Sequence, residues 1–423
     1  MTQHERRLAM TATTKRIRRI RLLLASELSG YDISESLWKG SPMPHIRTKA
    51  RLAVVAALGV TLAACSAGGT TSTAAAPSTA ATTACPSAAT PAGQGGQGAG
   101  QGARPNLTAA TTVASSDTST SIVLDGSGPS IQCGRVALTS HNDVQYDTTP
   151  GGRQLRFDVQ VPDTPGPKPL VVYLTGGGFQ SDNKTGNLDQ RTYVAEQGFV
   201  VASIEYRVID DGATYKETVA DVKSAIRYLR AHAGEYSIDL NEVAVWGQSA
   251  GGYLAAMTGA TNGLSQFEGT GNPGQSSAVQ AVVDQFGPSN FAKLAADFDT
   301  AMQDAMYAPG GFLAQYSIGT DTKQSVLDDP AAVTAADPST YVTSSSPPFA
   351  LLHGSADNLV SPSQTLLVHN AIRAKGGEST RFVVQNAGHG DLNVLSGDTN
   401  AAKPWSSEQV VGHIASFLKD SLG

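Results

Sequence analysis

Short apolar runs recur along the second half of the chain, and they predict an α/β fold. The continuous runs are typical of strands covered on both faces, and they lie at residues 170–174, 200–204, 243–246, 279–286, 349–352 and 381–384. Two earlier stretches, 144–146 and 155–161, alternate apolar and polar residues, which predicts antiparallel edge strands. Helical patterns lie between the runs, the clearest at 218–232. This alternation predicts a mostly parallel central sheet with helices on both faces.

The aromatic residues indicate where the folded domain begins. No Phe, Trp or Tyr occurs between Trp38 and Tyr146, and a globular core needs large apolar side chains. We therefore predict a disordered Ala/Thr/Gly/Ser-rich linker over residues 65–130, because such a segment buries too little apolar surface to fold. The folded domain is predicted to span 131–423, a normal size for one α/β domain.

The N-terminus has the features of an export signal. Basic residues at 43–51 precede an apolar run at 52–62, and Leu-Ala-Ala-Cys at 62–65 resembles a bacterial lipobox. This predicts a lipoprotein signal peptide at 43–64 with lipidation of Cys65; an ordinary signal peptide cleaved nearby is the alternative. Residues 1–42 are interpreted as an extension from a mis-assigned start codon. The expected location is extracytoplasmic, secreted or on a bacterial cell surface, with membrane contact only through the lipid anchor.

Charge and cysteine content narrow the expected partners. The formal net charge is -6, which gives no basic surface for nucleic acid. Besides Cys65, only Cys85 and Cys133 are present, and no spacing is typical of a zinc site. An extracytoplasmic protein could bond Cys85 to Cys133, the alternative being two free thiols. We expect no metal and no organic cofactor.

A strand–turn–helix pattern around residue 249 indicates nucleophilic catalysis. The strand at 243–246 is followed by Gly-Gln-Ser-Ala-Gly at 247–251 and then by an apolar helical stretch at 253–257. The G-x-S-x-G nucleophile elbow requires this context, because its turn is so tight that small residues must flank the serine. Ser249 is therefore the predicted nucleophile. The alternative is a Gly-Ser surface loop, which an apolar helix would not follow.

The serine needs a base to take its proton, and the acid and then the histidine should follow it in the chain. His389, in a glycine-flanked loop past the last strand, is the predicted base. Asp357, which follows the strand at 349–352, is predicted to orient the imidazole. Asp391 is closer in sequence to His389, but it is too close to orient the ring. His353 also follows a strand, but it precedes the acid and is set aside.

The loop after the 170–174 strand should supply part of an oxyanion hole. It reads Thr-Gly-Gly-Gly-Phe at 175–179, and its glycines expose consecutive backbone N–H groups. The residue after the nucleophile, Ala250, should supply another N–H. A phosphate-binding loop is the competing interpretation, but the glycine spacing fits neither known phosphate motif.

Taken together, these motifs resemble the α/β-hydrolase esterases, in particular the hormone-sensitive-lipase-like and feruloyl-esterase-like carbohydrate esterase branch. The resemblance covers roughly residues 140–421. The motifs are Gly-Gly-Gly-Phe at 176–179, Gly-Gln-Ser-Ala-Gly-Gly at 247–252, His-Gly-x-x-Asp-x-x-Val at 353–360 and Gly-His at 388–389. The resemblance implies a catalytic triad made of Ser249, Asp357 and His389. It also implies an oxyanion hole formed by the backbone N–H groups of Gly177, Gly178 and Ala250. One position departs from the family, since Thr175 stands where a His usually opens the oxyanion motif.

The expected activity is hydrolysis of carboxylic esters, from small molecules or carbohydrates, through an acyl-enzyme. The long segment 291–346, between two core strands, is expected to cap the site and set substrate preference. One alternative is a serine peptidase of the prolyl-oligopeptidase type, which shares the fold and the triad order but usually carries a large extra domain. The second alternative is a non-catalytic surface-binding lipoprotein, which an intact triad disfavours.

Overall fold

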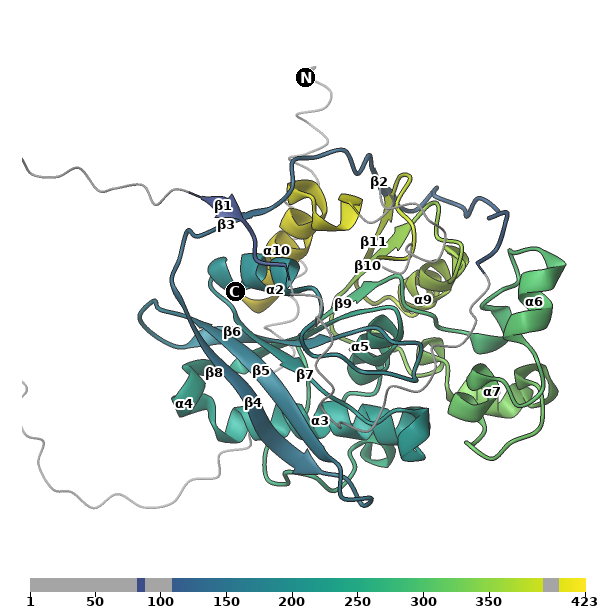
Figure 1. Cartoon of the computed structure of the whole chain (residues 1–423), viewed down its shortest axis with the longest axis horizontal. Helices are drawn as coiled ribbons and strands as arrows, with labels where there is room; N and C mark the ends of the chain where they lie inside the picture. Colours follow the sequence, from purple (N-terminus) through teal and green to yellow (C-terminus); the bar gives the residue numbers. More distant parts are fainter. Residues whose placement is uncertain (1–81, 88–108, 391–402) are drawn as a thin grey trace, which may run out of the picture. The chain divides into compact units, whose positions relative to one another are not determined.

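A computed structural model describes residues 82–87, 109–390 and 403–423 of the chain (Figure 1). The predicted extension 1–42, the signal peptide 43–64, Cys65 and Asp391 lie outside these residues. The described residues all belong to one compact unit, Ala75–Gly423.

A nine-stranded sheet forms the centre of this unit, in the order β2-β11-β10-β9-β8-β6-β7-β5-β4 (Figure 1). Among these nine strands β5 alone runs opposite to the rest, so it pairs antiparallel with both β4 and β7, and the predicted mostly parallel sheet with antiparallel pairing at its edge is confirmed. The strands are β2 Ile122–Leu124, β4 Leu138–Thr148, β5 Gln154–Pro162, β6 Lys168–Leu174, β7 Val200–Ile204, β8 Ile238–Gln248, β9 Ala281–Gln285, β10 Phe349–Gly354 and β11 Ser379–Val384.

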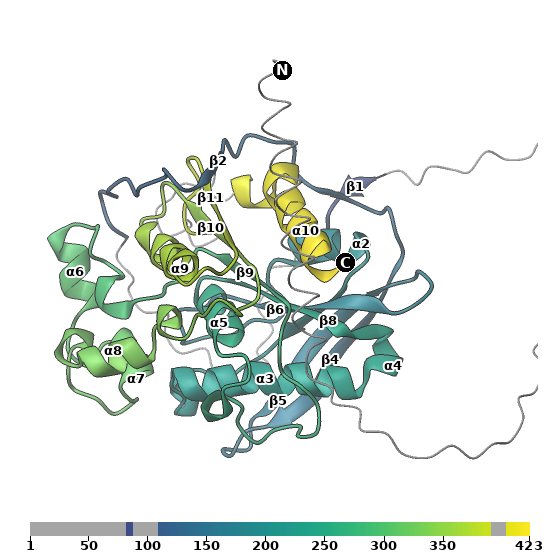
Figure 2. The same ribbon diagram turned by 180° about the vertical axis from the view of Figure 1, so that it is seen from behind.

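Helices cover both faces of the sheet, as the sequence predicted (Figures 1 and 2). Helices α2 (Leu188–Glu196) and α10 (Glu408–Leu422) pack on one face, and α3 (Tyr215–Ala231), α5 (Ala250–Ala260) and α9 (Ser363–Ala374) pack on the other. The short helix α4 (Ala233–Tyr236) follows α3. Two hydrophobic cores result, and β6 alternates between them, with Val172 in the first and Val171 in the second.

The chain between β9 and β10 forms a helical insertion. It contains α6 (Thr300–Met306), α7 (Phe312–Ser317) and α8 (Pro330–Ala335), with short 3-10 turns between them. Two of these helices begin at polar caps: Asp299 accepts the Met302 N–H, and Asp329 accepts the Ala332 N–H. This insertion corresponds to the segment predicted as a cap.

The folded domain begins earlier than residue 131, so that predicted boundary is wrong. Ala110 is buried and donates its N–H to the Asn358 carbonyl, and β2 pairs with Phe382–Val384 of β11. The prediction of a disordered linker over 65–130 therefore fails for residues 109–130. The boundary was predicted from the position of the first aromatic residues. A strand such as β2, which joins the sheet through backbone hydrogen bonds, needs few large side chains, so that prediction did not include it.

The two cysteines within the described residues are bonded to each other. The Cys85–Cys133 disulfide joins β1 (Thr83–Ala84) to β3 (Gln132–Cys133), and these strands form a separate antiparallel pair. No helix among the described residues has the length and apolar character needed to cross a bilayer.

Candidate active site

Ser249 occupies the tight turn between β8 and α5. Its φ of 54° lies in the left-handed region that residues with a side chain rarely adopt. The neighbouring glycines leave the necessary room: a Cβ on Gly247 would overlap the Gly251 carbonyl oxygen, and a Cβ on Gly251 would overlap that of Leu174. The Ser249 N–H donates to the Gln285 carbonyl at 2.9 Å. The turn thus holds the hydroxyl at the carboxyl end of β8.

The three predicted triad side chains meet at this edge of the sheet. Ser249 Oγ lies 2.7 Å from His389 Nε2, and His389 Nδ1 lies 2.7 Å from Asp357 Oδ2. Asp357 is fully buried, while His389 and Ser249 are 2% and 8% exposed. Because the carboxylate accepts from Nδ1–H, Nε2 is left to accept the serine proton. The arrangement has the geometry that general-base activation of a serine requires.

The Asp357 carboxylate is surrounded by hydrogen-bond donors. Its Oδ1 accepts the backbone N–H groups of Leu359 and Val360, at 3.0 and 2.9 Å. Burial on its own would raise the pKa of Asp357, but the interactions with His389 and His353 outweigh it and hold that pKa well below its usual value. The acid therefore stays ionised at neutral pH.

His353, set aside as the base on sequence grounds, belongs to this site, and the sequence prediction gave it no role. It is fully buried at the end of β10, with Nε2 3.2 Å from Asp357 Oδ2. The order rule for triads excludes it as the base, and that exclusion holds. The signal that could have identified it is its spacing, four residues before the acid at the end of the same strand.

The glycine loop after β6 lies against the nucleophile. A Cβ built on Gly176 would be 3.0 Å from Ser249 Cβ, and Gly178 has a φ of 59°, which glycine adopts without strain. Within the part of the chain that the structure describes, the N–H groups of Gly177 and Gly178 donate to no protein acceptor. Ala250 is the first residue of α5, so its N–H has no partner within the helix. All three predicted donors are available to an oxyanion.

Thr175, the departure from the family motif, supports this loop through hydrogen bonds. It is buried, its Oγ1 accepts the Asn183 N–H at 3.2 Å, and its carbonyl accepts the Tyr206 hydroxyl at 2.6 Å. The threonine thus ties the start of the glycine loop to Asn183 and Tyr206.

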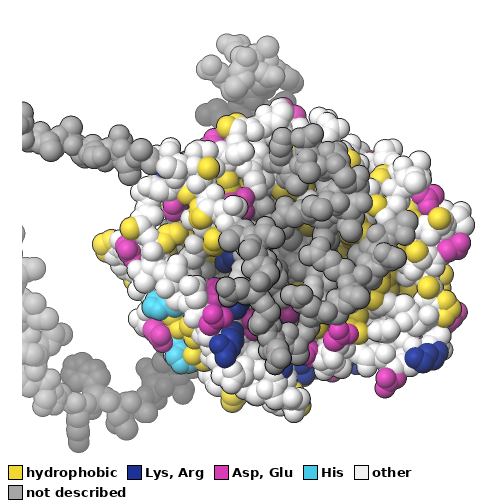
Figure 3. All heavy atoms as spheres, viewed as in Figure 1, with side chains coloured by type: hydrophobic (Ala, Val, Ile, Leu, Met, Phe, Trp, Pro, Cys, Tyr) yellow, Lys and Arg dark blue, Asp and Glu magenta, His cyan; other side chains and the backbone are white. Residues whose placement is uncertain are grey.

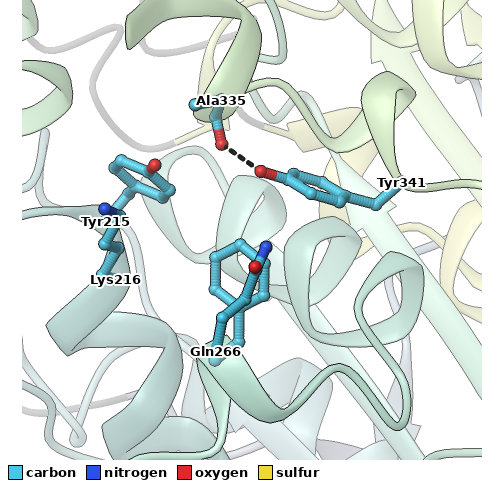
Figure 4. A pocket seen from close by; sticks show the side chains of 6 residues that line it. Tyr215, Lys216, Gln266, Ala335 and Tyr341 are labelled. Atoms are coloured by element: carbon cyan, nitrogen blue, oxygen red, sulfur yellow. Dashed lines mark hydrogen bonds between the residues drawn. The ribbon is translucent and has the colours of Figure 1, made fainter.

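The cavity shown in Figure 4 is separate from the triad. Its volume is about 280 Å³, and the Tyr341 hydroxyl donates to the Ala335 carbonyl at its rim. The other lining residues are Tyr215, Lys216, Gln266 and Phe267. None of these is a predicted site residue.

Charged side chains of both signs are mixed on one face of the molecule, and metal-ligating side chains do not cluster among the described residues. On the face shown in Figure 3, Lys and Arg side chains occur in small groups interspersed with Asp and Glu. Among residues 82–87, 109–390 and 403–423, no group of three or more His, Cys, Asp or Glu side chains could hold a metal ion.

The chain is similar in sequence to a family model and to proteins that are named as esterases. The BD-FAE family model matches residues 157–372, more than half of the chain. Probable carboxylic ester hydrolase LipM of Mycobacterium tuberculosis is 32% identical over 206 residues, which cover 47% of this chain and 43% of LipM. Esterase LipC of the same organism is 28% identical over 261 residues, 60% of this chain and 62% of LipC. The chain thus spans less than two thirds of these relatives.

The fold also matches solved structures. A truncated form of carbohydrate esterase from gut microbiota superimposes with a TM-score of 0.57 and 24% identity, covering 67% of this chain and 96% of that chain. At this level of identity the likeness concerns the fold alone, and it agrees with the sheet order and the helical layers described above.

Proposed function

This chain belongs to the BD-FAE family of α/β-hydrolases, and we propose that it is a serine esterase that hydrolyses carboxylic esters through an acyl-enzyme. One observation carries the proposal: the hydrogen-bonded series Ser249–His389–Asp357 lies beside three backbone donors that lack an acceptor among the described residues. A nucleophile, a base with its orienting acid, and an oxyanion site are the parts that acyl transfer requires.

The reaction follows from these positions. His389 Nε2 takes the Ser249 hydroxyl proton as Oγ bonds to the ester carbonyl carbon, and the N–H groups of Gly177, Gly178 and Ala250 stabilise the oxyanion. The imidazolium then gives its proton to the leaving alcohol, and the C–O ester bond breaks. Water enters, loses a proton to the same nitrogen and attacks the acyl carbon. Proton return to Oγ releases the acid and restores the serine.

The substrate class is a small-molecule or carbohydrate ester. The names of LipM and LipC refer to ester hydrolysis, and the carbohydrate esterase from gut microbiota shares the fold. A panel of acetylated xylan, feruloylated sugars and short- to medium-chain p-nitrophenyl esters would separate these groups. The helical insertion between β9 and β10 is the segment that we propose sets the preference.

The decisive experiment compares the wild type with Ser249→Ala on p-nitrophenyl acetate, p-nitrophenyl butyrate and a proline-anilide peptide. We expect turnover of the esters and a fall in kcat on the order of 10⁶ in the variant. Ser265→Ala, at an exposed serine in a 3-10 turn, is the control and should retain activity. Cleavage of the peptide alone would indicate a peptidase, and no turnover by folded wild-type protein would indicate a binding protein.

We also propose that the mature protein is extracytoplasmic and is lipidated at Cys65. The Cys85–Cys133 disulfide supports an oxidising location, because such bonds persist outside the cytoplasm. Growth with labelled palmitate should label the wild type and leave Cys65→Ser unlabelled. Equal labelling of both, or of neither, would contradict the anchor.

A further inference from the structure

A second histidine contacts the predicted catalytic acid, at the same carboxylate oxygen as the triad base. His353 Nε2 lies 3.1 Å from the Val360 carbonyl oxygen and 3.2 Å from Asp357 Oδ2. Asp357 Oδ1 in turn accepts the Val360 N–H. The imidazole therefore holds both the carboxylate and the far end of the four-residue turn that presents it.

The partner on the other ring nitrogen determines which tautomer His353 adopts. Its Nδ1 lies 3.1 Å from Thr365 Oγ1 on α9, and that oxygen accepts the Arg381 Nε–H, also at 3.1 Å. A guanidinium can only donate, so the threonine proton is free to be donated to Nδ1. An Nδ1 that accepts leaves the proton of the neutral ring on Nε2, where it faces Val360 and Asp357.

Arg381 is fixed in place by further hydrogen bonds. Its side chain is fully buried in β11, and its two terminal nitrogens donate to oxygens of the segment before β2 and of the turn before α9. These acceptors are Ser116, Asp117, Ser121 and Pro362. The guanidinium therefore cannot turn away from Thr365 without leaving buried donors unpaired, which would be costly.

The charged groups that face His353 agree with a neutral ring. They are the Asp357 carboxylate and the Arg381 guanidinium. Burial lowers the pKa of His353, and its contact with Asp357 only partly opposes that effect. A neutral imidazole orients the carboxylate without competing with His389 as a cation.

We propose that His353 is a positioning residue for the catalytic acid, held as the Nε2–H tautomer by Thr365 and Arg381. The side chain touches no substrate and acts only through Asp357. This inference rests on the proposed esterase function. The two can fail separately, because an inactive wild type would refute the function, whereas an unaffected His353 variant of an active enzyme would refute only the positioning role.

The test compares four variants with the wild type by kcat and KM for p-nitrophenyl acetate. His353→Leu removes the donor, while His353→Gln keeps an N–H near the position of Nε2. Thr365→Val removes the hydroxyl at nearly constant shape, and Thr365→Ser keeps it. We expect kcat to fall by up to about 100-fold in His353→Leu and about tenfold in Thr365→Val, with KM changed less than about twofold. His353→Gln and Thr365→Ser should recover most of the lost kcat.

The pH profile separates positioning from a general loss of structure. Loss of the His353 donor removes a hydrogen bond from the carboxylate that orients the base, so the pH dependence of kcat/KM should change in His353→Leu and should match that of the wild type in His353→Gln. Partial unfolding would lower the profile without moving it. Wild-type kcat in His353→Leu, or an equal loss in His353→Gln, would overturn the proposal. If His353→Leu does not fold, Thr365→Val becomes the test variant. An unchanged kcat in Thr365→Val would then overturn the proposal.

Discussion

The ring of Tyr316, in the helical insertion, stacks on the ring of Phe179, the residue that follows the glycines of the proposed oxyanion hole. The ring centroids are 3.9 Å apart and the planes are inclined by 12°. Phe179 has a φ of 64°, and its carbonyl accepts the Ile209 N–H at 2.9 Å. A residue in this backbone conformation needs support from its surroundings. The insertion, which connects β9 to β10 in the sequence, therefore also supports the backbone of the glycine loop.

Replacing Tyr316 should reduce activity through this contact. Tyr316→Leu removes the stack from a fully buried site, and we expect about 2–4 kcal/mol less stability and a roughly tenfold lower kcat as the loop loosens. Tyr316→Phe keeps the stack and loses only the hydroxyl contact with Thr218, 2.5 Å in length, so kcat should be retained at a cost of about 1 kcal/mol. Urea unfolding measures the stability of the two variants, and ester kinetics measure their kcat. Full kcat in Tyr316→Leu would contradict the bracing role.

Asp357→Asn should separate the effect of the negative charge of Asp357 from the effect of the shape of its side chain. The amide has nearly the same shape, but it cannot both accept from His389 Nδ1–H and stabilise an imidazolium, so we expect kcat to fall on the order of 10⁴-fold. Asp420→Asn, at an exposed position of α10, is the control and should be unaffected. A loss of less than about tenfold in Asp357→Asn would mean that another group orients the base.

The central sheet and the meeting of Ser249, Asp357 and His389 were predictable because each leaves a local signature. A strand covered on both faces must be apolar throughout, as Leu170–Leu174 is, and parallel strands must bring their carboxyl ends to one edge. Ser249 additionally needs small neighbours. Local sequence therefore indicated both the elements and the residues that follow them.

Strand β2 and the role of His353 were not predicted, because both depend on contacts with residues that are distant in the sequence. The strand Ile122–Leu124 has no amphipathic pattern of its own, and its placement comes from hydrogen bonds to Phe382–Val384 of β11, far along the chain. The role of His353 depends likewise on Thr365 and Arg381, which only the folded chain brings to its ring. The spacing of His353 before Asp357 is local, but no local pattern encodes the contacts of His353 with Thr365 and Arg381 or the pairing of β2 with β11.

A glycine at the elbow should tolerate no side chain. We expect Gly251→Ala to fail to fold or to lose more than about 3 kcal/mol, because its Cβ would overlap the backbone of Leu174 and Thr175. Gly412→Ala is the matched control, since a Cβ at that position on α10 meets nothing within 4 Å. It should stabilise the helix by about 0.5–1 kcal/mol. Thermal unfolding of both variants tests the pair, and equal midpoints would refute the steric account of the elbow.

The buried carboxyl of Asp284, beside the first turn of α5, should make stability depend on pH. Burial raises its pKa from 3.8 to about 7, and the hydrogen bond from the Gly287 N–H opposes this only partly. Between these values the folded protein holds a proton that the unfolded chain has lost, so stability should fall as pH rises from about 4 to about 7 and then level off. Asp284→Asn removes this contribution, which is about 1.4 kcal/mol for each pH unit that separates the folded from the unfolded pKa. Urea unfolding at pH 5 and pH 8 should therefore show a smaller pH difference in the variant, by a few kcal/mol. The same difference in both proteins would show that Asp284 does not titrate in this range.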